Sequence, residues 1–410
     1  MFNLRIIFPA IIVAIVFGSC RDKNTAAVLR LKNNSPVAVT DAVEIKNTPY
    51  KAVQLLNAGM AAVYEDGRQI PFQVVASRNG ETSILVLTEM EPNSVKELEV
   101  VKLEKPGGVE KFEKMTQAEL WIKEGGRFVG KQYEGGRFVR TDSLRVPDGF
   151  TDHAYYIKYE GPGWESDKVG YRFYLDWRNA IDVFGKKVTT MTLNEVGQDG
   201  YDSYHEPADW GMDILKVGNA LGVGSIAYWT GTKARRVDST DSVVCRVVED
   251  GILRSSILTN YYGWDNGNGK YNLDSYISID AGSRMSRMKL IFSGKEPDNI
   301  CTGINKDKNA ELVDVANEGD WACLASWGKQ SLANDHAGIA VFYKKSDLIQ
   351  LTEDELNHVV VLKPRNKKVE YCFAAAWEQE PGGVQSLEEF KNYLEWQLTR
   401  LNKPVSVSIR

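Results

Sequence analysis

The segment Tyr201–Leu215 (YDSYHEPADWGMDIL) holds the residue types best suited to chemistry in this chain. It places three Tyr or Trp rings, one histidine and four carboxylates within fifteen residues. Carboxylates are rarely buried without a partner, and a histidine among them is easily tuned to titrate near neutral pH. The segment therefore predicts a wet cleft that transfers protons or binds a polar ligand. The alternative is a surface loop whose Asp side chains bond their own backbone.

Three further segments mix Trp with Gly, Asn and charged residues: Glu160–Lys187, Asn260–Tyr271 and Ser326–Gly338. Aromatic faces beside polar side chains suit sugar rings, which stack through C–H faces and hydrogen-bond through hydroxyls. A single Trp is more often a core residue, so the repeated company of Gly, Asn and Asp is what favours a glycan surface. The candidates for substrate contact are Trp164, Trp210, Trp264, Lys329 and His336.

Within the first of these segments, Tyr171–Asp176 has the pattern of a strand. Side chains at alternate positions of a strand share one face, so Arg172 and Asp176 are expected to lie together. The spacing favours a structural ion pair. A functional arginine would instead clamp a planar carboxylate with two parallel hydrogen bonds.

The elements that must position these side chains are mostly β-strands. Short runs alternate apolar and polar residues, are rich in Val, Ile, Tyr and Thr, and are separated by Gly-, Asn- and Asp-containing turns, which is typical of antiparallel hairpins. The sequence therefore predicts an all-β protein built as a large antiparallel β-sandwich. Examples of these runs are Phe72–Val75, Ser83–Leu87, Ser242–Val248, Met288–Phe292 and Val369–Ala374.

One helix is predicted near the end of the chain. Ser386 and Glu389 form a capping box, an apolar stripe follows at helical spacing, and Pro404 ends it. The helix is expected to pack on a sheet and to carry no chemistry. No interior linker rich in Pro, Gly or Ser is visible, so residues 28–410 are expected to form one continuous domain.

A short repeat is also present, because EGGRFV at Glu124–Val129 recurs at Glu134–Val139. The spacing of ten residues equals one strand and one turn. The repeat therefore predicts two turns in consecutive hairpins. Two copies are too few for a solenoid.

The first residues are typical of an export signal. Arg5 is followed by the apolar run Ile6–Phe17, too short to span a bilayer, and small residues precede Cys20. The sequence predicts a lipoprotein signal peptide over residues 1–19, with Cys20 as the lipidated residue and 20–27 as a tether. The alternative is an ordinary secretory cleavage site. No second long apolar run follows, so a lipid-anchored body is expected in the periplasm or outer membrane of a Gram-negative bacterium.

Composition excludes some partners and cofactors. The net charge is −5 and becomes −6 without the signal segment, so nucleic acid is not an expected partner. No zinc, redox or nucleotide motif appears, so no cofactor is expected, although calcium among the Asp residues stays open. The later cysteines lack a CxxC pair and lie in apolar or strand-like runs, which favours free thiols. They are Cys245, Cys301, Cys323 and Cys372.

Several stretches together resemble a known family. LRLKNNSPVAVTDAVEIKN with its later IPFQVV, DWRNAIDVFGKK, YHEPADWGMDILKVGNALGVGS and EYCFAAAWEQEPGG with its helix are similar to an uncharacterised family of Bacteroidota periplasmic lipoproteins. That family, a domain of unknown function, occurs in polysaccharide-utilisation loci. The strand-rich pattern also resembles the super-β-sandwich of galactose mutarotase-like proteins, which include polysaccharide lyases. The resemblance implies a polysaccharide or oligosaccharide substrate, and it assigns no catalytic residue.

With that resemblance, the residues predict a lyase that cleaves uronic-acid-containing oligosaccharides by β-elimination. A base removes the proton beside the uronate carboxylate, a cation stabilises the enolate, and an acid protonates the leaving oxygen. His205 is the candidate base, Tyr204 the candidate acid, and Arg178 or Lys216 the candidate cation.

Two other functions stay open. A glycoside hydrolase needs two carboxylates that flank the scissile bond, and Glu206 and Asp209 are the nearest pair. A lipoprotein that binds glycan without cleaving it would use the same polar and aromatic surface.

Overall fold

The computed structural model describes residues 24–76, 82–316 and 318–410. The predicted signal peptide and Cys20 lie outside these ranges, so lipidation stays a prediction. No helix in the described ranges is long and apolar enough to cross a membrane. Strands dominate the architecture, as predicted, and the strands of every sheet pair antiparallel.

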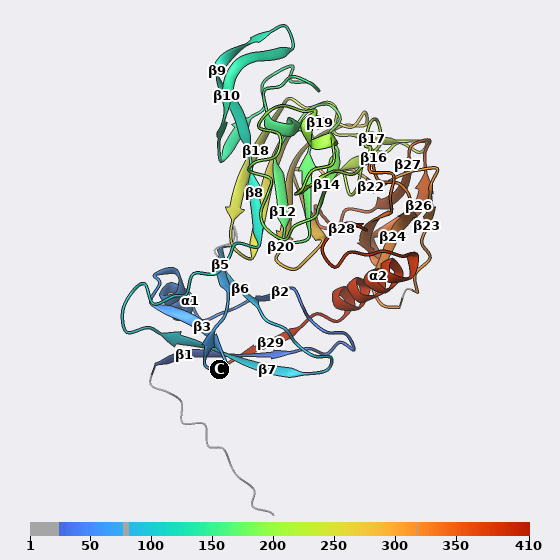
Figure 1. Cartoon of the computed structure of the whole chain (residues 1–410). Coiled ribbons are helices and arrows are strands. Elements are labelled where there is room, and N and C mark those ends of the chain that lie inside the picture. Colours follow the sequence, from blue (N-terminus) through green and yellow to red (C-terminus); the bar gives the residue numbers. More distant parts are fainter. Residues whose placement is uncertain (1–23, 77–81, 317) are drawn as a thin grey trace, which may run out of the picture.

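The N-terminal part consists of two small sheets around helix α1 (Tyr50–Asn57), shown at the bottom of Figure 1. The first strand begins at Thr25, three residues before the predicted start of the domain. The five-stranded sheet has the order β29 (Ser406–Ile409), β1 (Thr25–Lys32), β7 (Val95–Lys102), β3 (Ala61–Glu65) and β4 (Arg68–Gln69). The three-stranded sheet has the order β2 (Ala42–Ile45), β6 (Thr82–Leu87) and β5 (Phe72–Ala76). The last strand of the chain thus returns to the first.

The main part is built on a nine-stranded sheet. Alternation along its long strands turns apolar side chains toward a second layer, which is how a sandwich core forms. Its strands, in order, are β11 (Ser143–Arg145), β18 (Ser242–Asp250), β19 (Arg254–Asp265), β20 (Lys270–Asp280), β21 (Met285–Ser293), β28 (Lys368–Trp377), β25 (Ala337–Lys344), β24 (Trp321–Gly328) and β23 (Ala310–Leu312).

The second layer consists of two five-stranded sheets. The first has the order β15 (Gly211–Asp213), β14 (Ile181–Lys186), β13 (Val169–Phe173), β12 (Gly163–Ser166) and β8 (Thr116–Glu119). The second has the order β17 (Ala234–Arg236), β16 (Ala227–Trp229), β22 (Ile300–Asn305), β27 (Asn357–Leu362) and β26 (Leu348–Glu353). Gly222 and Val223 form single bridges to Ile181 and Ile304 and so join the two sheets.

A buried apolar cluster fills the space between the layers. Trp164, Tyr171 and Phe173 of the second layer belong to it together with Met288 and Phe373 of the nine-stranded sheet. A separate apolar cluster holds the N-terminal sheets together, and a small group of buried residues, Ala42, Leu85, Leu253 and Ala281, connects the two parts. Whether residues 28–410 fold as one unit stays a prediction.

Helix α2 (Leu387–Asn402) covers the other face of the nine-stranded sheet (Figure 1). The predicted N-cap is present, since Ser386 Oγ accepts a hydrogen bond from Glu389 N, whereas the Glu389 carboxylate accepts one from Gln385 N rather than from the backbone N–H of Ser386. Phe390 and Leu394 are buried against the sheet. The predicted all-β sandwich with a C-terminal helix is therefore confirmed.

The EGGRFV repeat has a different role from the one predicted. Its two copies lie in the two strands of one hairpin, β9 (Trp121–Val129) and β10 (Gln132–Arg140), which projects at the top of Figure 1. Antiparallel pairing places each Glu opposite an Arg, as in Glu124 opposite Arg137, and sets glycine opposite glycine. The prediction of two consecutive hairpins was wrong because a local repeat does not reveal that its copies pair with each other.

Candidate functional site

The outer face of the sheet β8–β12–β13–β14–β15 carries buried charge. Its inner-facing residues are apolar and belong to the sandwich core, whereas the alternate positions point the opposite way. An outer face of this kind normally meets water, but here the polar side chains are buried. These outer residues are Gln117, Glu119, Glu165, Arg172, Asp182, Lys186 and Asp213.

Aromatic residues from two covering segments, residues 151–162 and 187–210, explain this burial. They form a small apolar cluster over Phe184 of β14. The charged layer is thus enclosed between a sheet and a polypeptide cover, and ionic groups in such a place need partners to offset their desolvation. The cluster consists of Tyr159, Phe184, Leu193, Val196, Tyr201 and Tyr204, with Tyr155 and Trp210 partly buried against it.

Arg172 is the centre of the charged layer. Its Nε and Nη2 donate to Asp182 Oδ2 at 3.1 and 2.8 Å, and Nη2 also donates to Asp213 Oδ2 at 2.5 Å. Nη1 donates to the Tyr204 hydroxyl at 2.8 Å. Burial, followed by the nearby Asp213 carboxylate, raises the pKa of Asp182. The guanidinium therefore holds together three side chains from β14, β15 and the covering segment.

His205 connects this buried layer to solvent. Its Nε2 lies 3.4 Å from Asp213 Oδ2, and its side chain is 44% exposed whereas that of Asp213 is 1% exposed. The hydrogen bond to Asp213 raises the pKa of His205, more than burial opposes it. Because Nε2 faces Asp213, Nδ1 is the nitrogen placed to exchange a proton with a ligand. A carboxylate that orients an exposed imidazole is a common arrangement for a general base.

Arg178 lies at the other end of the same network. Its Nη2 is 2.7 Å from Glu160 Oε1. Its Nε and Nη2 also donate hydrogen bonds to the Asp176 carboxylate. Glu160 Oε2 in turn lies 4.0 Å from Arg172 Nη1, so Glu160 and Arg172 link Arg178 to Asp213. The predicted Arg172–Asp176 ion pair was wrong. Strand β13 ends at Phe173, so alternation no longer holds at Asp176.

The covering segment beside Arg178 has an unusual backbone. His153, Tyr155, Tyr159 and Glu160 all have positive φ, between 36° and 71°. Such conformations in residues other than glycine cost free energy and gather at functional sites, where the surroundings hold them. Here the Glu160 carboxylate accepts a hydrogen bond from His153 N at 2.9 Å, which fixes the segment.

Sequence reasoning missed residues 153–159 of this segment because no glycine or motif marks them. The only signal was its run of histidine and tyrosines, HAYY at 153–156. His153 is exposed, and its ring lies near Tyr201, with a centroid distance of 6.4 Å. Hairpin β9–β10 runs beside it, since Tyr133 N donates to Ala154 O at 2.7 Å. The exposed rim of the site therefore includes His153 as well as His205.

The other residues of the Tyr201–Leu215 segment are divided between interior and surface. Tyr204 is 2% exposed and accepts its hydrogen bond from Arg172, so it cannot reach a substrate as the general acid. Glu206 and Asp209 are exposed, as is Lys216, which directly follows the segment. Trp210 is half-buried and packs edge-on against Phe184 with a centroid distance of 5.8 Å.

Two of the predicted sugar platforms are core residues. Trp164 and Trp264 are both 0% exposed, so neither ring can stack on a sugar. Trp164 lies on β12 at an inner-facing position and donates from Nε1 to Ser286 Oγ at 2.9 Å. The prediction failed because strand alternation, rather than the polar neighbours, decides which way a tryptophan points.

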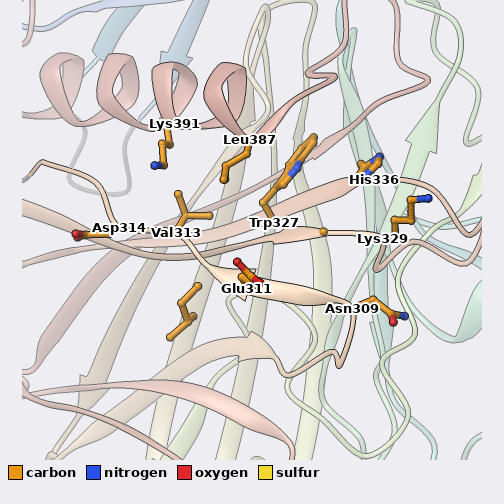
Figure 2. Close-up of a pocket in the computed structure, with 11 residues that line it drawn as sticks. Asn309, Glu311, Val313, Asp314, Trp327, Lys329, His336, Leu387 and Lys391 are labelled. Atoms are coloured by element: carbon orange, nitrogen blue, oxygen red, sulfur yellow. The ribbon is translucent and has the colours of Figure 1, made fainter.

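His336 and Lys329 lie elsewhere, in a cavity of about 580 Å³ between β23, β24 and α2 (Figure 2). They are not among the contacts of the Arg172 network. Among the described residues, no group of three or more His, Cys, Asp or Glu side chains is arranged to hold a metal ion. Calcium binding stays a prediction. The four cysteines predicted to be free are unpaired in the structure.

The chain belongs to a family of unknown function, because the family model described as Domain of unknown function (DUF4861) matches residues 31–407. The predicted resemblance to such a family is confirmed. A relative described as "Uncharacterized protein P7", from Formosa agariphila, is 24% identical over 358 residues, which are 81% of this chain and 80% of the relative.

Two solved structures resemble the fold. One is an alpha-mannosidase from Enterococcus faecalis V583, with a TM-score of 0.45 and 9% identity, covering 94% of this chain and 46% of the mannosidase. The other is a glycosyl hydrolase family 38 protein from Enterococcus faecalis, with a TM-score of 0.45 and 8% identity, covering 94% of this chain and 47% of that protein. The chain thus spans just under half the length of either protein.

Proposed function

We propose that this DUF4861 protein is a carbohydrate-active enzyme that cleaves a uronate-containing glycan by β-elimination, with His205, Arg178 and His153 as its reacting groups. The observation that carries the proposal is the His205–Asp213 pair. An exposed imidazole is held by a buried carboxylate, which is itself fixed by Arg172. This arrangement orients one ring nitrogen toward solvent and supplies a base that works near neutral pH.

The reaction needs three groups. His205 Nδ1 takes the proton from the carbon beside the substrate carboxylate, the electron pair of that C–H bond forms a C=C bond, and the C–O bond to the leaving sugar breaks. The leaving oxygen takes a proton from an acid, for which exposed His153 replaces the buried Tyr204. A cation close to the carboxylate lowers the energy of the enolate-like transition state.

Arg178 suits the role of that cation. Its side chain is 12% exposed, and its Nε and Nη2 are held by Asp176, so Nη1 is the group that would meet a substrate carboxylate. Burial acts to lower the pKa of Arg178, but the hydrogen bonds to Asp176 and the nearby Glu160 carboxylate together raise it, which keeps the guanidinium charged. Lys216 is exposed and is the alternative cation.

The carboxylates favour elimination over hydrolysis. A glycosidase needs a general acid whose pKa is raised and a second carboxylate, both facing the substrate. Asp182 has the raised pKa but is 1% exposed and bonded to Arg172. Asp152, on the rim, has its pKa lowered to about 2, chiefly by a hydrogen bond from Trp177. Glu206 and Asp209 lie on the surface without a burying environment.

The proposal extends to location. An apolar run before Cys20 supports export and lipid anchoring, with the body held at the membrane by lipid alone. An anchored enzyme of this kind would act on glycan fragments outside the cytoplasm.

The test is incubation of the protein with uronate-containing and neutral polysaccharides. Elimination creates an unsaturated uronate, whose ultraviolet absorbance rises with time, and His205→Ala should abolish that rise. His358→Ala is the matched control, because His358 also pairs with a carboxylate, Glu353 at 3.4 Å, but lies on β27. New reducing ends without absorbance would show hydrolysis, and binding without product would show a binding protein. Either outcome would overturn the proposal of elimination.

A further inference from the structure

The cavity between β23, β24 and α2 has the chemistry of a second ligand site. Figure 2 shows His336, Lys329 and Asn309 at one end, Lys391 and Asp314 at the other, and Trp327 and Leu387 between them. Its volume of about 580 Å³ lies within the range of small-molecule sites. Nothing in the proposed elimination uses these residues.

His336 is held in one orientation although it faces solvent. Its Nδ1 lies 2.6 Å from Glu378 Oε2, and its backbone carbonyl oxygen accepts a hydrogen bond from Glu378 N at 3.1 Å. The ring stacks on Trp327, with an interplanar angle of 8°, and Phe390 supports the indole at a centroid distance of 5.3 Å. Because Nδ1 is bound to Glu378, Nε2 is left to meet a ligand. A polar ring that is 35% exposed yet fixed from two directions is preorganised for binding.

Two large apolar side chains of the cavity lining are exposed. Leu312 and Leu387 are 52% and 42% exposed, which is high for large apolar side chains. They belong to β23 and to the first turn of α2, and both line the cavity. Apolar carbons between two polar ends match a sugar ring, whose C–H faces are apolar and whose rim carries hydroxyls.

The charges that line the cavity indicate whether its ligand is a charged or an uncharged sugar. The two lysines, Lys329 and Lys391, are balanced by two carboxylates, Glu311 and Asp314, so the cavity carries no excess of either sign. Donors and acceptors are both present, which suits hydroxyl groups that donate and accept. A uronate would find no net positive charge in this cavity.

The cavity is linked to the strand that carries Asp213. Leu332 N donates to Ile214 O at 2.9 Å, and Ser331 forms a bridge with Leu215. The loop between β24 and β25 that carries Lys329 and His336 is therefore anchored directly after β15.

From these observations we infer that the cavity is a subsite for an uncharged sugar residue of the same glycan, apart from the bond that is cleaved. The inference rests on the proposed function for the choice of a glycan ligand. His336 and Lys329 would bind hydroxyls, and Leu312 and Leu387 would contact the apolar face of the ring.

The experiment uses the inactive His205→Ala protein and oligosaccharides of increasing length, obtained from the polysaccharide that the wild type cleaves. Calorimetry measures their affinity with and without His336→Ala or Lys329→Ala. Each loses hydrogen bonds to the ligand, so we expect Kd for the longer oligosaccharides to rise about fivefold to tenfold. Lys289→Ala, an exposed lysine on β21, is the matched control and should leave Kd unchanged.

Leu312→Asp provides a second variant, because Leu312 is exposed and its replacement does not open the core. It should also weaken binding of long oligosaccharides, while turnover of the shortest cleavable substrate in the active protein stays unchanged. Equal affinities in all pocket variants and in the control would overturn the subsite and leave the proposed elimination standing. A wild type that neither cleaves nor binds any glycan would instead refute the proposed function.

Discussion

Replacing Arg172 is the sharpest test of the buried charged layer. Arg172→Met keeps a side chain of comparable length but removes the cation that Asp182 and Asp213 share. Both carboxylates are 1% exposed in the folded protein, so neither can recover its lost partner from water. Removing one partner from a buried ion pair costs about 3–5 kcal/mol, because the remaining charge stays desolvated. A domain whose stability lies in the middle or upper part of the usual range of about 5–15 kcal/mol would still fold.

The stability that Arg172→Met loses should also depend on pH, in a direction that can be predicted. Burial already raises the pKa of Asp182 in the folded protein, and loss of Arg172 should raise it further. A group with a raised folded-state pKa binds its proton more tightly when folded, so stability falls as pH rises above the ordinary carboxyl pKa of 3.8. The variant should therefore lose more stability at about pH 8 than at about pH 5.

Urea unfolding followed by tryptophan fluorescence measures both effects. Arg145→Met is the matched control, because Arg145 pairs with Asp148 at the surface, where the two side chains are 55% and 82% exposed. Such a pair contributes less than about 1 kcal/mol. If Arg172→Met cost no more than this control at either pH, water would have to reach the carboxylates, and the covering segments would not enclose the charged layer as described.

Three further outcomes are expected. The activity of the enzyme should decline below the pKa of His205, which the hydrogen bond to Asp213 raises above its usual 6.5, and Asp213→Asn should move that acidic limit of kcat/KM to lower pH. Gly185→Ala should destabilise the protein by about 1–3 kcal/mol in urea unfolding, because the new Cβ would lie 2.4 Å from Trp377. Cys20→Ser should release the protein from membranes on fractionation, whereas mass spectrometry of an unlipidated mature N-terminus in the wild type would contradict the proposed anchor.

Local patterns in the sequence were sufficient to predict the fold class. Strand alternation and turn residues act over a few positions, and the cap that Ser386 gives to Glu389 N spans only four residues. Pairing between distant segments is not encoded in this way. The EGGRFV copies were assigned to separate hairpins, although Glu124 and Arg137 are cross-strand partners within one.

The site was predictable only in part for the same reason. His205 and its partner Asp213 both lie in the segment that the sequence singled out, but Arg172, which fixes the buried Asp213, lies on the distant strand β13. Whether a strand residue points toward the core or away from it depends on its position in the alternating pattern. Trp164 points into the core, whereas the adjacent Glu165 lies on the outer face of the sheet. The strain at His153 arises from tertiary contacts and leaves no signature in residue type.

Tyr204 and His205 are neighbours in the sequence, but Tyr204 is buried against Arg172 whereas His205 is exposed to solvent. The Tyr204 hydroxyl accepts a hydrogen bond from buried Arg172, and its ring lies 4.6 Å from that of His205, centroid to centroid. Tyr204→Phe removes this hydrogen bond but keeps the ring, so the free energy of unfolding should fall by about 1 kcal/mol. If the network positions His205, kcat should fall by more than tenfold while KM changes little. A fall in stability with unchanged kcat would mean that Tyr204 only supports the covering segment and that His205 is oriented by Asp213 alone.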